Sequence, residues 1–183
     1  LQLQDIRSRQ DQLGAVNYDL FASHFFAGHP YAMSTSGTFE SLEAMSAADL
    51  REYLAAVVDP KQLVIVVVGD VDASECIERF EQMFSGVKSI ESELTPDLSV
   101  PRHAGKALVS ANLDKNQSHI IVGFDAPTLE SDDRFALEIL HAVLSGQGGR
   151  LFYELRDKQS LAYSVYASML LGVEASTFAV NIG

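Results

Sequence analysis

The 183 residues, 47% of them apolar, suffice for one ordinary domain or two small ones with a hydrophobic core. Thirteen basic side chains against 25 acidic ones leave a net charge of −12, which argues against nucleic acid and anionic membranes as partners. The single cysteine excludes an internal disulfide and a zinc ribbon, and no apolar run approaches the roughly 20 residues that span a bilayer.

The first half of the chain predicts three helices and one strand. Residues 3–27 carry apolar side chains at helical spacing, which indicates a helix with one buried face. Ser46 and Asp49 resemble a capping box at the start of a second helix. Residues 63–68 are almost all β-branched and predict a strand buried on both faces. Asp72 then caps a third helix.

The second half predicts four strands and two helices. Residues 107–113 and 118–124 are typical of strands joined by a short polar turn, and the runs 161–171 and 174–182 are also strand-like. A helix from Ser131 precedes a glycine-rich turn, and a short helix over 150–158 follows that turn. The apolar stripe of the first of these helices is expected to be buried and consists of Phe135, Ile139, Leu140, Val143 and Leu144.

A change in composition predicts the domain boundaries. Residues 88–106 contain two prolines, scattered serine and glutamate and little periodicity, which is typical of a linker. We therefore predict one domain within 1–87 and part of another within 107–183. Helices and strands do not alternate strictly, which favours an α+β fold with a two-layer antiparallel or mixed sheet and helices on one face. Because the last predicted strand runs to the end of the chain, we expect the protein to continue beyond it.

Most catalytic templates are absent from the sequence. No histidine has a second histidine four residues on, so neither zinc-peptidase histidine motif occurs, and His24 and His29 would need a third ligand. The turn at 146–150 follows a helix and lacks the spacing of a phosphate loop, so it predicts a flexible connection between helices. No G-x-S-x-G elbow supports serine-hydrolase chemistry.

The most informative stretch is GGRLFYELRDKQSLAYSVYA, residues 148–167. It places Arg156 near the end of the short helix and Tyr163 seven residues later in the following strand, where alternation puts Tyr163 on the same face as Val165 and Ala167. Taken alone, the tyrosine is typical of a core aromatic with a surface-directed hydroxyl, and the arginine of a solvated helix-end cation.

This stretch resembles the C-terminal half of the insulinase/pitrilysin/mitochondrial-processing-peptidase family of zinc metallopeptidases. In that family a Gly-rich turn, an R-L-F-x-E-L-R helix and an L-A-Y-S-V strand recur in the same order. The first half of the chain is also similar to the family, through FFAGHPYAMSTSGTFESLEAMSAADLREYL followed by DPKQLVIVVVGDVD. The resemblance covers most of residues 1–183 and implies α+β domains arranged as two halves of a clamshell around a peptide.

The resemblance also implies roles for two residues and a place for the metal. An arginine and a tyrosine seven apart reach from one half of such a peptidase into the zinc site of the other, and they match Arg156 and Tyr163. The arginine would help to hold the peptide substrate, and the phenol would stabilise the transition state by donating to the carbonyl oxygen. The resemblance implies that the zinc motif lies N-terminal of Leu1, because its histidines are absent from this sequence. Asp5 stands where the family's third ligand, a glutamate, is expected, which favours the non-catalytic half.

We therefore expect a substrate-binding portion of a zinc endopeptidase that binds no metal itself and has no protease activity on its own. Its partner would be the other half of the same chain or a subunit carrying the zinc motif. One alternative is a catalytically inactive scaffold or partner subunit of the same family. Another is a small nucleotide-binding domain, suggested by the apolar run that ends at Gly69 and Asp70. The compartment stays open between cytoplasm and periplasm.

Overall fold

The computed structural model describes residues 2–58, 63–87 and 105–183. The chain divides into two compact units: Leu1–Phe39 together with Asp97–Gly183 form the first, and Glu40–Pro96 form the second. The predicted linker, 88–106, lies almost entirely outside the described residues, so the domain boundaries drawn around it stay a prediction. No helix in the described ranges is long and apolar enough to cross a membrane.

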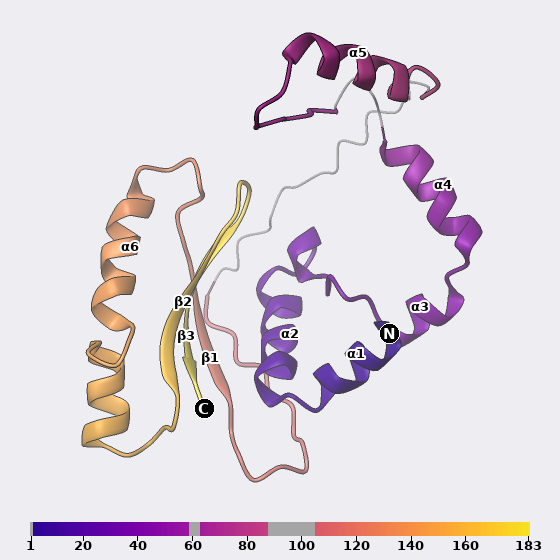
Figure 1. Cartoon of the computed structure of the whole chain (residues 1–183). Coiled ribbons are helices and arrows are strands. Elements are labelled where there is room, and N and C mark those ends of the chain that lie inside the picture. Colours follow the sequence, from indigo (N-terminus) through magenta and orange to yellow (C-terminus); the bar gives the residue numbers. More distant parts are fainter. Residues whose placement is uncertain (1, 59–62, 88–104) are drawn as a thin grey trace. The chain divides into compact units, whose positions relative to one another are not determined.

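The first unit contains a three-stranded antiparallel sheet (Figure 1). Its strands are β1 (Ile120–Asp125), β2 (Val165–Leu171) and β3 (Ser176–Ile182), in the order β1-β3-β2. Val180 of the central strand β3 lies opposite Val122 of β1 and Ala167 of β2. Three of the predicted strands, 118–124, 161–171 and 174–182, are thus confirmed, although each starts two to four residues later than predicted and the first ends at Asp125. The α+β class is confirmed as well.

Helices cover both faces of this sheet rather than the one face that we predicted. α2 (Leu13–Phe25) packs near β1 on one side, and α6 (Asp133–Leu144) packs against β2 on the other (Figure 1). The Phe21 ring of α2 occupies the space that a Cβ at Gly123 would need, so the missing side chain admits the helix. The central strand β3 is buried from Ser176 to Ala179 and pairs with a strand on either side.

The end of α2 forms the core of this unit together with the loop between β2 and β3. Phe26 is 1% exposed and packs with Ala22 and Ala175. The ring of Tyr31, in the short 3₁₀-helix η1 (Pro30–Ala32), meets the Phe26 ring edge to face at 5.7 Å between centroids. Edge-to-face geometry is a preferred arrangement for aromatic pairs.

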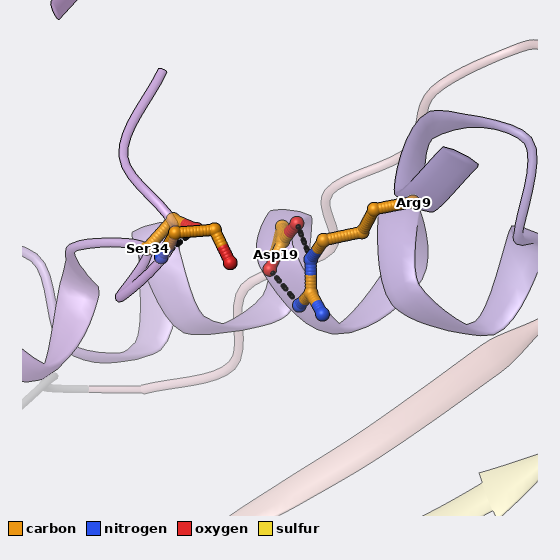
Figure 2. Close-up of polar contacts among 4 residues, drawn as sticks. Arg9, Asp19 and Ser34 are labelled. Carbon is orange, nitrogen blue, oxygen red and sulfur yellow. Dashed lines mark hydrogen bonds and ion pairs between the residues drawn. The ribbon is translucent and has the colours of Figure 1, made fainter. Parts of the chain in front are cut away.

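The predicted helix over 3–27 is two helices, α1 (Gln2–Gln10) and α2. Figure 2 shows how they are joined: Arg9 donates to both carboxylate oxygens of Asp19, at 2.7 and 3.0 Å. This hydrogen bonding raises the pKa of Arg9 above its ordinary value. The break after α1 therefore leaves two helices that a bidentate ion pair joins.

The second unit contains two helices whose N-terminal caps are the residues that the sequence predicted. They follow α3 (Phe39–Ala44), whose first residue belongs to the first unit. In α4 (Ala47–Val57), Ser46 accepts from the Asp49 backbone while the Asp49 carboxylate accepts from the Ser46 backbone. In α5 (Ala73–Phe84), Asp72 accepts from two backbone N–H groups of the first turn. Both caps satisfy donors that a helix start leaves without intrahelical partners.

Two predicted strands are wrong. Residues 63–68 and 107–113 have no regular secondary structure. Val64, Val66 and Val68 are exposed rather than buried on both faces. A strand forms only where a neighbour satisfies its backbone groups, and no described segment pairs with either run. Local sequence patterns alone therefore predict more strands than form.

The predicted buried stripe of α6 is also wrong for most of its members. α6 instead turns His141 toward β2, where its Nε2 lies 3.0 Å from the Ala167 carbonyl oxygen and the Ser145 hydroxyl donates to the same oxygen. Leu137 and Leu144, four residues before and three after His141, share this face and are half-buried. The outward residues, 42–68% exposed, are Phe135, Ile139, Leu140 and Val143.

Candidate functional site

The candidate site begins where a glycine turn leads from α6 into the π-helix η2 (Phe152–Lys158). Gly146 has a φ of 79°, which glycine adopts without strain. Gly149 is buried, and a Cβ there would collide with the carbonyl oxygens of Ser145 and Leu144. The predicted turn between two helices is confirmed, and two of its glycines, Gly146 and Gly149, have a steric reason. π-Helices are rare in proteins, and those that occur are often found at functional sites.

Arg156 lies on η2 between two aromatic rings. Its guanidinium carbon Cζ is 4.7 Å from the centroid of the Phe152 ring and 5.0 Å from that of the Tyr163 ring. Both distances are within the range of about 6 Å for a cation–π interaction. The structure therefore brings together the two residues that the sequence singled out, Arg156 and Tyr163.

The turn after η2 sets this arrangement. Ser160 has a φ of 52°, in the left-handed region, and its N–H donates to the Arg156 carbonyl oxygen at 3.0 Å. The Leu161 N–H donates to the Leu155 carbonyl oxygen at 2.9 Å. These two bonds satisfy carbonyl groups that a helix end leaves free, and the left-handed residue reverses the chain. Tyr163 consequently returns to the side of Arg156.

Tyr163 has a backbone held by hydrogen bonds and an exposed side chain. Its N–H donates to the Gly183 carbonyl oxygen at 2.8 Å, and Ser164 and Gly183 exchange two further backbone bonds. The side chain is 81% exposed, whereas Val165 is 6% exposed. The prediction that Tyr163 shares a face with Val165 is wrong, because Tyr163 lies in a bend before β2 and strand alternation does not apply there.

The polar groups of the pair are open to a ligand. Within the described parts of the chain, neither the Arg156 guanidinium nor the Tyr163 hydroxyl has a hydrogen bond or an ion pair with another residue. By contrast, Lys158 on the same helix lies 2.8 Å from a Glu154 carboxylate oxygen. The arginine supplies a fork of N–H donors and the tyrosine one O–H donor, which suits a carbonyl or carboxylate oxygen.

The described residues do not fit a zinc site. His24 Nδ1 is 2.9 Å from the Leu20 carbonyl oxygen, and buried His29 accepts from the Tyr31 N–H. Asp5 is exposed on α1. Across the ranges that the structure describes, no three His, Cys, Asp or Glu side chains gather where they could hold a metal ion. His103 lies outside those ranges.

Phe152 is the site residue that sequence reasoning missed. It precedes Arg156 by four residues, a spacing that places two side chains on one side of a helix. That spacing is the signal that could have identified Phe152. The same spacing is equally typical of an aromatic residue on the buried face of a helix. Its contact with the guanidinium becomes visible only in the folded chain.

Comparison with known proteins gives a consistent family assignment. Residues 44–183 match the family model described as the Peptidase M16 inactive domain. The chain is 31% identical to an uncharacterized zinc protease of Mycobacterium leprae, over 97% of this chain and 41% of that protein. It is 25% identical to the zinc protease PqqE of Helicobacter pylori, over 88% of this chain and 37% of that protein. The chain thus spans about two-fifths of the length of these relatives.

Solved structures show the same fold. A protease from Helicobacter pylori superposes with a TM-score of 0.79 at 21% identity, over 100% of this chain and 45% of that one. A peptidase M16 inactive domain from Pseudomonas fluorescens gives a TM-score of 0.73 at 19% identity, over 99% of this chain and 44% of that one. The resemblance to insulinase/pitrilysin-type metallopeptidases is confirmed: the chain belongs to the M16 peptidase family and contains its inactive domain.

Proposed function

We propose that this chain is the substrate-binding, non-metal-binding portion of a zinc-dependent endopeptidase, and that it contributes Arg156 and Tyr163 to the binding of a peptide. Its membership of the inactive-domain family supports the absence of a catalytic centre of its own. Relatives of about two and a half times its length are named zinc proteases. We therefore assign zinc and peptide-bond cleavage to another part of the full-length protein or to a partner subunit.

The observation that carries the proposal is the open donor set at the end of η2. The guanidinium of Arg156 is held by two rings, and its N–H donors have no carboxylate partner among the described residues. Tyr163 adds an exposed hydroxyl beside it. A peptide carbonyl presents the complementary acceptor, so the pair can bind a peptide backbone through hydrogen bonds.

The two side chains would act at different stages. Arg156 carries a permanent charge and binds the peptide before and during the reaction. The Tyr163 phenol would donate to the carbonyl oxygen of the peptide as that oxygen gains negative charge. A donor that acts on developing charge lowers the barrier by about 3 kcal/mol, which is roughly a hundredfold in kcat.

The proposal is tested by peptide turnover in the full-length protein, with any partner subunit present. Tyr163→Phe should lower kcat by about a hundredfold with a smaller change in KM. Arg156→Ala should weaken peptide binding as well. Two variants serve as matched controls: Tyr166→Phe removes the hydroxyl of another exposed tyrosine, and Arg134→Ala removes an arginine that lies 4.6 Å from the Phe135 ring centroid.

Unchanged turnover in both Tyr163→Phe and Arg156→Ala would overturn this assignment. An inactive full-length protein, assayed with its partner, would instead support the alternative of a catalytically silent scaffold. The nucleotide-binding alternative has lost its motivation, because the apolar run before Gly69 and Asp70 is not a strand in the structure.

A further inference from the structure

The guanidinium of Arg156 is held in an unusual way. Within the part of the chain that the structure describes, it lies over two aromatic rings: Phe152, four residues earlier in η2, and Tyr163, in the bend before β2. Arg156 is half-buried. An arginine side chain carries about 2 kcal/mol of rotamer entropy, which it loses when it binds in one orientation. Something must therefore restrict Arg156 if it is to present its donors to a ligand in one direction.

Lys158 shows the contrasting arrangement on the same helix. Its ammonium lies 4.6 Å from the Tyr153 ring centroid and also 2.8 Å from a Glu154 carboxylate oxygen. The carboxylate uses part of the donor capacity of that lysine. A ring attracts a cation through its face and accepts none of the strong hydrogen bonds that a carboxylate would take. Contact with Phe152 therefore restricts Arg156 without using its N–H donors.

From this geometry we propose that Phe152 is a positioning residue, which holds the Arg156 guanidinium beside Tyr163 with its N–H donors free for a peptide. The proposal rests on the proposed function of Arg156 and Tyr163 and adds a residue to that site. Phe152 belongs to η2 and is half-buried there, so its ring has less freedom than a fully exposed ring. It can serve as a fixed surface, whereas the exposed Tyr163 ring cannot do so alone.

The kinetic arm of the test uses the full-length protein with any partner it needs. Phe152→Leu keeps an apolar side chain but removes the ring, and Phe152→Tyr restores one. Loss of a cation–π contact at a partly exposed site should lower kcat/KM by about two- to fivefold in Phe152→Leu. We expect Phe152→Tyr to recover most of this loss. Phe135→Leu, which removes the ring beside Arg134, should leave kcat/KM unchanged.

A double-mutant cycle separates positioning from simple packing. If Phe152 acts through Arg156, Phe152→Leu should have no further effect on kcat/KM in an Arg156→Ala background. An equal loss in both backgrounds would overturn the proposal, since the ring would then act independently of the arginine. Thermal unfolding of each variant, monitored alongside, identifies any loss that comes from instability.

A structural arm gives an answer that does not depend on activity. In crystal structures of the full-length protein, the Arg156 guanidinium should be ordered against residue 152 in the parent and in Phe152→Tyr. It should be displaced or disordered in Phe152→Leu. An unmoved guanidinium in Phe152→Leu would overturn the positioning role even if Arg156 proves essential. If Arg156→Ala leaves turnover unchanged, the proposed function fails, and the structural arm still decides what Phe152 does.

Discussion

The guanidinium carbon of Arg156 lies 5.0 Å from the ring centroid of Tyr163, although the two are seven positions apart in sequence. The arginine belongs to the π-helix η2, and the tyrosine belongs to the bend before β2. Their meeting depends on a turn at Ser160 and on backbone hydrogen bonds between the bend and Gly183. The turn and the backbone hydrogen bonds that hold this pair in place can therefore be tested by stability measurements, separately from any effect on peptide turnover.

Ser160→Gly should stabilise the chain or leave it unchanged, with a gain of up to about 1 kcal/mol. A non-glycine residue in the left-handed region costs about 1–2 kcal/mol, and the greater chain entropy of glycine offsets part of the relief. Chemical denaturation measures the change. Gln159→Gly is the control: with a φ of −106° it gains no relief, so it should destabilise the chain. A loss of stability in Ser160→Gly would contradict the strained turn.

Gly149→Ala should destabilise the chain by about 1–3 kcal/mol. The added Cβ has no room beside the backbone carbonyls of Ser145 and Leu144, so the turn before η2 must shift. Gly148→Ala is a matched control one residue away, because nothing lies within 4 Å of a Cβ built there. Equal unfolding temperatures for the two variants would show that the turn is not sterically restricted.

Phe26→Ala should lower the free energy of unfolding by about 3–5 kcal/mol, the range for deleting a buried aromatic ring. Phe26 is 1% exposed and contacts Ala22 and Ala175, so its loss leaves a cavity between α2 and the β2–β3 loop. Phe135→Ala removes a ring that is 52% exposed and should cost much less. Urea denaturation of both variants compares them directly, and a similar cost for the two would place the core elsewhere.

The start of α4 should lose stability in acid. Hydrogen bonds from the Ser46 backbone and side chain lower the pKa of Asp49 below its ordinary value. A lowered pKa contributes stability above the unfolded value of about 3.9, and this contribution is lost as the pH falls through the lowered pKa. Protection factors for amide exchange at the Ser46 and Asp49 N–H groups, followed from pH 6 downward, measure this loss. Asp49→Asn should remove the pH dependence of the protection factors. A pH dependence that persists in Asp49→Asn would exclude Asp49 as the cause.

The features that could be predicted from the sequence all depend on residues that lie close together in the chain. The Ser46 and Asp72 caps, the glycine turn before η2 and the strands over 165–171 and 176–182 were all indicated by local patterns. Caps and turns use hydrogen bonds between residues only a few positions apart, so the sequence alone carries their determinants. The resemblance to M16 peptidases rests likewise on ordered local motifs, and the family comparison confirms it.

Tertiary structure decided which of these segments acquire neighbours. Residues 63–68 and 165–171 are both apolar and partly β-branched, but only the second is a strand, because β3 pairs with it. Strand formation requires a partner that satisfies backbone groups, and the sequence of the strand does not specify that partner. The contact of Arg156 with Tyr163 has the same origin, because a helix, a left-handed turn and the end of a sheet must all be in place before these two side chains meet. Phe152, by contrast, contacts Arg156 within η2 itself.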